Sequence, residues 1–403
     1  MKSTLLITLA LFASQSFAVT PAEQAIRQAA ANIETQPSHY PYYNDLAMAY
    51  ARRARETSDG QYYAKADETL KKSLAISPDN FGALRVAAFL QLERHEYARA
   101  LESATKLNKT MPDDVSIYGY LVEANVELGN YKDAIAAAQW MLDLRPGNSA
   151  GLIHASYLRE LHGKLPGALE LMQMASEATP QAESEDRAWI LAQISHLQLL
   201  SGDLSQAETA ANKALHAFPD YHYALAALAQ VRIAQARYAD AVALLQKRYE
   251  AAPHAENLYA LGEAQELAGR HEEAQTSFRK FETMSRAEST LADNSNRELV
   301  SYYVDHAGDP AKALEVARRE VARRHDIFTL DSYAWALAAN KEYAEANRQI
   351  QSALATGVKD PAVLYHAGSI ALRLHENERA DAYLKDAAAR HSREAASLLA
   401  AER

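Results

Sequence analysis

Alanine recurs along this chain at an almost fixed interval, and that interval constrains the fold more than any other feature. Seven of the nine intervals are 33 or 34 residues and two are 39, between Ala66, Ala100, Ala134, Ala168, Ala207, Ala241, Ala274, Ala313, Ala346 and Ala380. A period of this length, in a composition rich in helix formers, is typical of stacked helix-turn-helix units. The sequence therefore predicts an all-α solenoid of about ten repeats.

Composition narrows the classes of partner and of chemistry. The formal net charge is -10, so we expect no general affinity for nucleic acid or for anionic lipid. The 403 residues include no cysteine, which excludes disulfides, thiolate metal sites and a cysteine nucleophile.

The N-terminus has the pattern of a secretory signal peptide. Lys2 supplies a positive charge, residues 5–13 are apolar, and Ser16 and Ala18 are small residues at the two positions that signal peptidase reads. We expect cleavage after Ala18 and a mature protein that is periplasmic or secreted. The apolar run is too short to span a bilayer, and no later segment reads as a membrane helix.

Residues 115–148 illustrate one repeat. Tyr118, Leu121 and Val122 lie on one face of a first helix, and the pair at 129–130, Gly-Asn, breaks that helix. A second helix then presents Ala134 and Ala138, whose small side chains let two helices approach closely. The recurring alanine is therefore interpreted as a packing constraint and not as a site.

These units resemble the tetratricopeptide repeat (TPR) family over nearly all of the mature chain. An aromatic residue three positions before the alanine is shared by five units, as Tyr63, Tyr97, Tyr131, Tyr238 and Tyr343. The eighth unit departs most from the pattern, because Arg297 stands where a bulky apolar residue belongs. The resemblance implies a right-handed superhelical solenoid whose first helices line a concave groove.

The stride breaks at three places. In the first unit, a seven-residue excess around residues 55–60 lengthens the helix pair or its turn. The polar stretches 182–187 and 286–296 predict hinges, loops or helix extensions, and the pattern does not choose among them. They divide a solenoid over residues 37–392 into blocks 37–180, 188–284 and 294–392. We expect residues 19–36 and 393–403 to form helices that cap its two ends.

The sequence contains no recognisable catalytic or metal-binding motif. The histidine–glutamate pairs at His95, His271 and His375 lack the second histidine of a zinc-protease helix and fall at or beside the turn between the two helices of a unit. No nucleophile elbow or phosphate loop is present, so we predict no cofactor, no metal and no enzymatic activity. A basic cluster, Arg318, Arg319, Arg323, Arg324 and His325, is interpreted as a solvated convex face paired with Glu315 and Glu320.

The concave wall is the remaining candidate for function. Its inward positions are assigned by matching each repeat to the family pattern. They are rich in acids and aromatics and include Glu93, Glu123, Glu127 and Glu298. We predict a partner-binding groove made by Tyr157, Trp189, His196, Tyr223, Tyr259, Glu263, Glu266, Tyr302, Asp305, Trp335 and Tyr365. Such a wall suits an extended protein or peptide segment with basic or apolar side chains.

The sequence thus favours a non-enzymatic scaffold that binds a protein or peptide partner. A narrower alternative is an adaptor in envelope assembly or polysaccharide export. An alternative of another class is an enzyme that uses the solenoid as a platform, which the length disfavours because ten repeats take up the mature chain.

Overall fold

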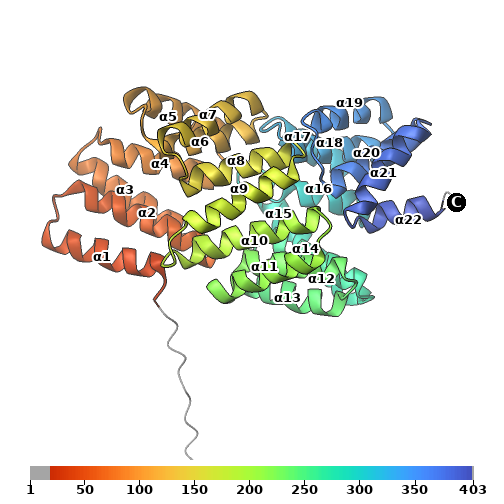
Figure 1. The fold of residues 1–403 in the computed structure, drawn as a ribbon, viewed down its shortest axis with the longest axis horizontal. Coiled ribbons are helices and arrows are strands. Elements are labelled where there is room, and N and C mark those ends of the chain that lie inside the picture. The colour runs from red at the N-terminus through yellow and green to blue at the C-terminus, as the bar shows by residue number, and fades with distance from the viewer. Residues whose placement is uncertain (1–18, 402–403) are drawn as a thin grey trace, which may run out of the picture.

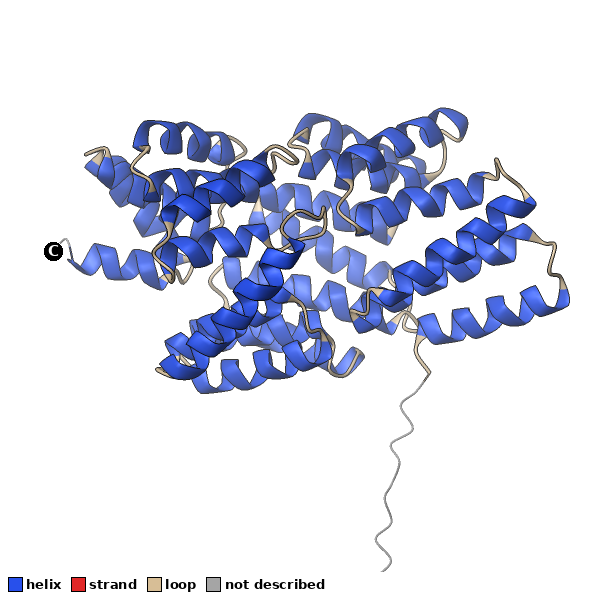
Figure 2. Ribbon diagram, turned by 180° about the vertical axis from the view of Figure 1, so that it is seen from behind, coloured by secondary structure: helices blue, strands red, loops and turns tan. Residues whose placement is uncertain are grey.

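The protein, described here from a computed structural model of residues 19–401, consists of helices joined by short turns and loops. No strand occurs within those residues (Figure 2). The expected signal peptide, residues 1–18, and the last two residues of the expected C-terminal cap lie outside the described part of the chain.

Ten helix pairs follow one another, as the alanine period predicts. Their first helices are α2 (Tyr40–Thr57), α4 (Phe81–Glu93), α6 (Val115–Glu127), α8 (Ser149–Leu161), α10 (Ser184–Leu200), α12 (His222–Ala234), α14 (Ala255–Leu267), α16 (Asn296–Asp305), α18 (Ile327–Ala339) and α20 (Pro361–Arg373). Their second helices are α3 (Gln61–Ile76), α5 (Tyr97–Thr110), α7 (Tyr131–Leu144), α9 (Leu165–Ala178), α11 (Leu204–Ala217), α13 (Tyr238–Ala251), α15 (His271–Glu288), α17 (Pro310–Val321), α19 (Tyr343–Leu354) and α21 (Asn377–Ala389). Two further helices, α1 (Pro21–Thr35) and α22 (Arg393–Ala401), pack on the first and last pairs.

All ten recurring alanines are completely buried, with 0% of their surface exposed. Each lies on a second helix, where close packing between neighbouring helices leaves room for a methyl group only. The interpretation of these alanines as packing residues is confirmed.

The turn inside most repeats contains one residue with a left-handed backbone. In the third repeat this is Gly129, with φ 76°, and in the second and tenth it is His95 and His375, with φ 57° and 60°. A left-handed residue ends a helix and lets the chain reverse. Two of the three histidine–glutamate pairs therefore mark helix ends, as the sequence predicts, while His271 begins α15.

The two irregular stretches have different structures. Most of residues 182–187 belongs to α10, which begins at Ser184, so this insertion lengthens a first helix. Residues 286–288 lengthen α15, and residues 289–295 then form a loop before α16.

The solenoid coils back until early repeats touch late ones (Figure 1). The turns within early repeats contact the loops between later repeats, and we call these the closing contacts. His254 Nε2 donates a hydrogen bond to the carbonyl oxygen of Ser58 at 2.9 Å, across 196 residues. Ile327 N donates to the Tyr131 hydroxyl at 2.9 Å, again across 196 residues, and Arg390 donates to the Leu200 carbonyl at 2.7 Å across 190.

Glycine permits the closest of these approaches. A Cβ atom on Gly163, in the turn of the fourth repeat, would lie 2.1 Å from the carbonyl oxygen of Gly357. Gly163 also has a φ of 66°. Both the backbone conformation and the contact with the later loop therefore require glycine at this position.

Candidate ligand-binding chamber

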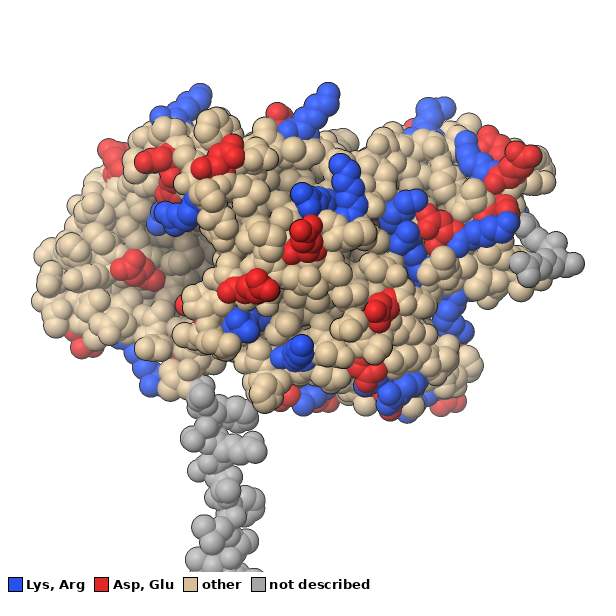
Figure 3. All heavy atoms as spheres, viewed as in Figure 1, with Lys and Arg blue, Asp and Glu red and all other residues tan. Residues whose placement is uncertain are grey.

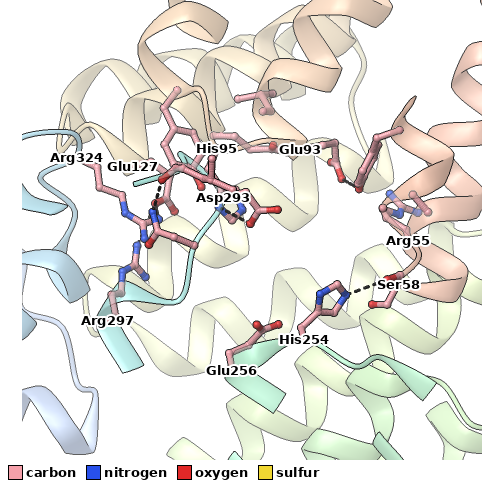
Figure 4. A pocket seen from close by; sticks show the side chains of 18 of the residues that line it. Arg55, Ser58, Glu93, His95, Glu127, His254, Glu256, Asp293, Arg297 and Arg324 are labelled. Atoms are coloured by element: carbon pink, nitrogen blue, oxygen red, sulfur yellow. Dashed lines mark hydrogen bonds and ion pairs between the residues drawn. The ribbon is translucent and has the colours of Figure 1, made fainter. Parts of the chain in front are cut away.

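The coiled solenoid encloses a chamber of about 700 Å³, a volume in the range of small-ligand sites. Its wall combines first helices of early repeats, among them α2, α4, α6 and α8, with α12, α13, α14, α16 and the loop 289–295. Figure 4 shows Glu127, Arg297 and Arg324 gathered on one side of the chamber and Arg55 and Ser58 on another. Residues far apart in the sequence therefore meet in one site.

Carboxyl groups outnumber guanidinium groups on this wall. The seven carboxyl groups belong to Glu93, Glu123, Glu127, Glu256, Glu288, Asp293 and Glu298. The four guanidinium groups belong to Arg55, Arg248, Arg297 and Arg324. The chamber thus favours ligands that carry positive charge.

One buried ion cluster joins early and late repeats at the chamber wall. The carboxylate of Glu127 in α6 accepts hydrogen bonds from Arg297 at 3.2 Å and from Arg324 at 3.3 Å. Arg297 also pairs with Asp326 at 3.1 Å, and Arg324 with Glu320 at 2.6 Å. These arginines are engaged in the fold and are not free to hold a ligand.

This cluster corrects the prediction of a solvated convex patch. The expected pairs of Arg319 with Glu315 and of Arg324 with Glu320 are present. Arg324 is nevertheless only 6% exposed and lines the chamber, because the loop after α17 packs against the end of α6. Arg323 donates to the carbonyl oxygens of Thr290 and Leu291 in the loop before α16.

Arg55 is likewise engaged by the fold. It pairs with Glu185 at 2.6 Å and with Asp186 at 2.7 Å, both in the extension that begins α10. The carbonyl oxygen of Arg55 accepts from His222 Nε2 at 3.3 Å. The first irregular stretch therefore supplies acids that hold an early repeat in place.

Several other charged groups of the chamber have no partner of opposite charge. Glu256 and Glu298 form no ion pair within 4.0 Å among residues 19–401, and the nearest such partner of Glu123 is His154 Nε2 at 3.7 Å. Arg248 also forms no ion pair in that range, and its Nε atom is buried without a hydrogen-bond partner. Glu256, Glu298 and Arg248 are half-buried, and a partly desolvated charge without a partner is costly, so these groups are the ones a ligand would satisfy.

Burial shifts the titration of the unpaired groups. Loss of water, reinforced by Glu93, raises the pKa of Glu123 to about 8, and burial also raises the pKa of Glu298. Burial lowers the pKa of His154 to about 4, so this histidine is neutral at pH 7 and provides no cation for Glu123. The side chain of Glu123 is 46% exposed, and that exposed part faces the chamber.

Aromatic side chains complete the wall. Tyr223 in α12 is 40% exposed although it lines the chamber, which is unusual for a large aromatic residue inside a fold. Its ring lies 4.1 Å from that of His222, measured between centroids. The exposed face of Tyr223 is therefore open to a ligand.

Of the predicted groove residues, the chamber brings together Tyr157 and Tyr223. Four others form a cluster on α14 and α16: Tyr259 and Tyr302 pack on Phe278, Glu263 pairs with His306, and Asp305 accepts from Trp335 Nε1 at 3.0 Å. Tyr302 is only 9% exposed, so it belongs to the core.

Trp335 and Tyr365 line a second cavity, of about 750 Å³, near the C-terminal end. Trp335 stacks on His366 with a centroid distance of 4.2 Å, and His366 in turn contacts Asp331 at 2.9 Å. One face of the Trp335 ring is thus already used within the fold.

The remaining three predicted residues lie elsewhere. Trp189 is half-buried in the packing around α10, His196 contacts Glu160 at 2.9 Å, and Glu266 contacts His271 at 2.8 Å. Sequence reasoning did not single out Arg248 or Glu256. Arg248 lies near the end of a second helix, and only the coiling of the solenoid brings that position to the inner wall.

Comparison with known proteins identifies the repeat. A model described as tetratricopeptide repeat matches residues 85–149 and 121–183. Over residues 85–183 the chain belongs to the tetratricopeptide repeat family. It is also similar to the protein SGT1 homolog of Bos taurus, at 32% identity over 91 residues, which are 23% of this chain and 27% of that protein.

One solved structure extends the likeness of fold over most of the chain. A human IFIT1 dimer with PPP-AAAA superposes with a TM-score of 0.51 at 13% identity, covering 91% of this chain and 86% of that one. PilW, a widely conserved type IV pilus biogenesis factor, matches with a TM-score of 0.43 at 15% identity, over 50% of this chain and 92% of that one.

In the described part of the chain, no three histidine, aspartate or glutamate side chains gather where they could hold a metal ion. Within the same residues, no helix combines the length and apolar character needed to cross a membrane.

Proposed function

We propose that this protein is a non-enzymatic scaffold that takes a segment of a protein partner into the central chamber. The observation that carries this proposal is the set of unsatisfied groups on one inner wall, namely Glu256, Glu298, Arg248 and the exposed ring of Tyr223. Preformed sites with a few well-placed polar groups and an aromatic surface are typical of specific recognition.

Charge argues for a peptide segment and against an RNA ligand. The structure of human IFIT1 is described with PPP-AAAA, but at 13% identity the two proteins share a fold and no more. In this chain seven carboxyl groups line the chamber, and they would repel a triphosphate. Over the face drawn in Figure 3, basic and acidic side chains are interspersed, which offers no continuous track for a phosphate backbone.

The signal-like N-terminus supports a further part of the proposal, that the protein works in the periplasm or outside the cell. An adaptor in envelope assembly or polysaccharide export is one form that such a scaffold would take. The enzymatic alternative has one observation in its favour, the raised pKa of Glu123, because perturbed carboxyl groups are common in active sites.

Capture of the partner tests this proposal. Tagged protein is expressed in its native host and cross-linked, and the captured proteins are compared between wild type and Tyr223→Ala. Because aromatic anchors contribute about 2 kcal/mol or more to an interface, we expect the variant to lose the partner while keeping its helical circular dichroism spectrum. The intact mass of the same tagged protein tests export, because cleavage of the signal peptide should leave Val19 as the first residue.

A matched variant distinguishes the chamber from the second cavity. Trp335→Ala removes one aromatic residue of the C-terminal cavity and leaves the chamber untouched. Capture that survives Tyr223→Ala but is lost with Trp335→Ala would move the binding site to the C-terminal cavity. Turnover of a substrate by the purified protein, abolished by Glu123→Gln, would replace the scaffold with an enzyme.

A further inference from the structure

We propose that the C-terminal cavity is a second binding site, which takes a free fatty acid as its ligand. The hydrocarbon tail lies along the aromatic and aliphatic wall of the cavity, and the carboxylate head lies at the rim, where Lys341 and Arg373 supply positive charge. This inference goes beyond the scaffold proposal and depends neither on that proposal nor on the central chamber.

The C-terminal cavity is separate from the chamber. Residues of α16, α18, α20 and α22 line it, at the end of the solenoid where these helices gather (Figure 1). Its volume of about 750 Å³ is in the range of small-ligand sites. None of the residues that line it also lines the chamber, so the two sites can be altered independently.

The wall of this cavity is mainly apolar. The Trp335 indole N–H already donates to Asp305 at 3.0 Å, and one face of the ring stacks on His366, so the rest of the ring presents apolar surface to the cavity. A methylene group that leaves water for such a surface raises affinity about fourfold. The aliphatic and aromatic lining residues are Val304, Trp335, Ala338, Ala339, Tyr343, Tyr365, Ile370, Leu372 and Leu398.

The charged residues that line the cavity are both basic. Lys341 lies in the turn between α18 and α19, and Arg373 is the last residue of α20. Both are exposed, and neither forms an ion pair within 4.0 Å among residues 19–401. A carboxylate at this rim keeps its contact with water and gains charge-assisted hydrogen bonds, while the tail enters the apolar part of the cavity.

The polar groups of the wall are too few for an extended peptide. Each peptide residue brings a backbone N–H and a C=O that need hydrogen-bond partners when they leave water. Apart from the two cations and the engaged indole N–H, the polar side chains that line the cavity are those of Ser369, Asn377, Tyr343 and Tyr365. A hydrocarbon tail needs no such partner, so the wall fits a fatty acid better.

Charge also favours a free fatty acid over a membrane surface. The whole chain carries a formal net charge of -10, which opposes its approach to anionic lipid. Segments that bind such surfaces typically carry about four to eight lysine or arginine residues, whereas the basic residues that line this cavity are Lys341 and Arg373 alone. Two cations suit the head of one small anion.

Tryptophan fluorescence tests this site directly, because Trp335 lines it. The tryptophans of the chain are Trp140, Trp189 and Trp335, so the double variant Trp140→Phe/Trp189→Phe keeps Trp335 as its one tryptophan. Dodecanoate with a bromine at the end of its tail, which quenches tryptophan on contact, should quench this variant in a saturable way. The matched variant that keeps Trp189 alone should show no saturable quenching. Circular dichroism checks that both variants are folded, and calorimetric titration of the wild type with dodecanoate measures binding without any substitution.

Competition against the brominated probe separates the tail from the head. From octanoate to dodecanoate, affinity should rise about fourfold per methylene. Methyl dodecanoate, which lacks the charge, should bind about tenfold more weakly than dodecanoate, and Lys341→Gln/Arg373→Gln should remove this difference. Lys385→Gln is the matched control, because Lys385 pairs with Asp381 and does not line the cavity, so the difference should persist.

Absence of saturable quenching of Trp335 together with no heat of binding, or an affinity that does not depend on tail length, would overturn the proposal. Quenching by vesicles of brominated phosphatidylglycerol, without quenching by monomeric bromododecanoate, would replace the free fatty acid with a membrane. Displacement of the probe by a leucine- and glutamate-rich peptide at a lower concentration than dodecanoate requires would replace it with a protein segment. Tyr223→Ala alters the chamber and should leave the quenching unchanged, so failure of this proposal is distinguishable from failure of the scaffold proposal.

Discussion

Replacing Glu127 with alanine is expected to destabilise the closed solenoid by about 3 kcal/mol. The change leaves Arg324, which is 6% exposed, and Arg297 beside each other without the carboxylate between them. Asp326 and Glu320 still pair with these arginines. The expected loss of stability is therefore at the lower end of the range for breaking a buried ion cluster. Long repeat arrays need not unfold in one step, so hydrogen exchange of residues 322–327 and of α6 is the measurement.

An exposed pair provides the comparison. Glu102→Ala removes a carboxylate that is 67% exposed and pairs with Lys106 on the same helix, α5. Such surface pairs contribute little, so the exchange pattern should stay unchanged. Equal effects of the two substitutions would show that the Glu127 cluster does not hold the early and late repeats together.

Gly163→Ala is expected to have the second large effect. The new methyl group would lie 2.1 Å from the Gly357 carbonyl oxygen, so the loop after α19 must move away. The left-handed backbone at φ 66° adds a penalty of its own. We expect a lower melting temperature and faster hydrogen exchange at residues 355–360.

Gly202→Ala separates the two causes. Gly202 has a φ of 86° in the equivalent turn of the fifth repeat, and nothing lies within 4 Å of its would-be Cβ atom. Gly202→Ala should lower the free energy of unfolding only through backbone strain, by about 1 kcal/mol. Gly163→Ala should lower it by about 2 kcal/mol more, through the forced displacement. Equal losses of unfolding free energy in the two variants would mean that the contact with Gly357 contributes nothing to stability.

The repeat architecture could be predicted because it depends on a short-range sequence pattern. Ala134 and its nine equivalents repeat because every second helix packs in the same way, and all ten are buried as expected. The turn at Gly129 and the helices before and after the array follow from the same local reasoning. Each of these features depends on neighbours within one or two repeats.

The closure of the solenoid could not be predicted in that way. It joins residues such as Tyr131 and Ile327, which are 196 positions apart, and depends on small rotations added up over many repeats. The sequence did carry a signal, because the departures from the repeat pattern mark the contacts. Arg297 in the eighth unit pairs with Glu127, the extension at 182–187 engages Arg55, and residues of the loop 289–295 face His95 and Arg323.

The candidate site was predicted in part. Position within the repeat placed five residues on the inner wall, and all five line the chamber: Glu93, Glu123, Glu298, Tyr157 and Tyr223. Tyr259, Trp335 and their neighbours occupy inner positions as well, but they pack against one another, since adjacent first helices lie close in the later repeats. Which inner residues stay unsatisfied is decided by pairing across the closed solenoid, and that pairing is not visible in the sequence.

The distance between early and late repeats tests the closure most directly. This distance can be measured with labels on introduced cysteines, because the chain has no cysteine of its own. Nitroxide labels on Gln61→Cys and Ala251→Cys sit three residues from Ser58 and His254, which are joined by a hydrogen bond of 2.9 Å. Pulsed electron paramagnetic resonance should give one short, narrow distance distribution, comparable in width to that of Gln61→Cys with Lys72→Cys on α3, whose Cα atoms lie about 16 Å apart along the helix. A broad or long distribution for the first pair, with the second pair narrow, would show an open solenoid and would contradict the chamber.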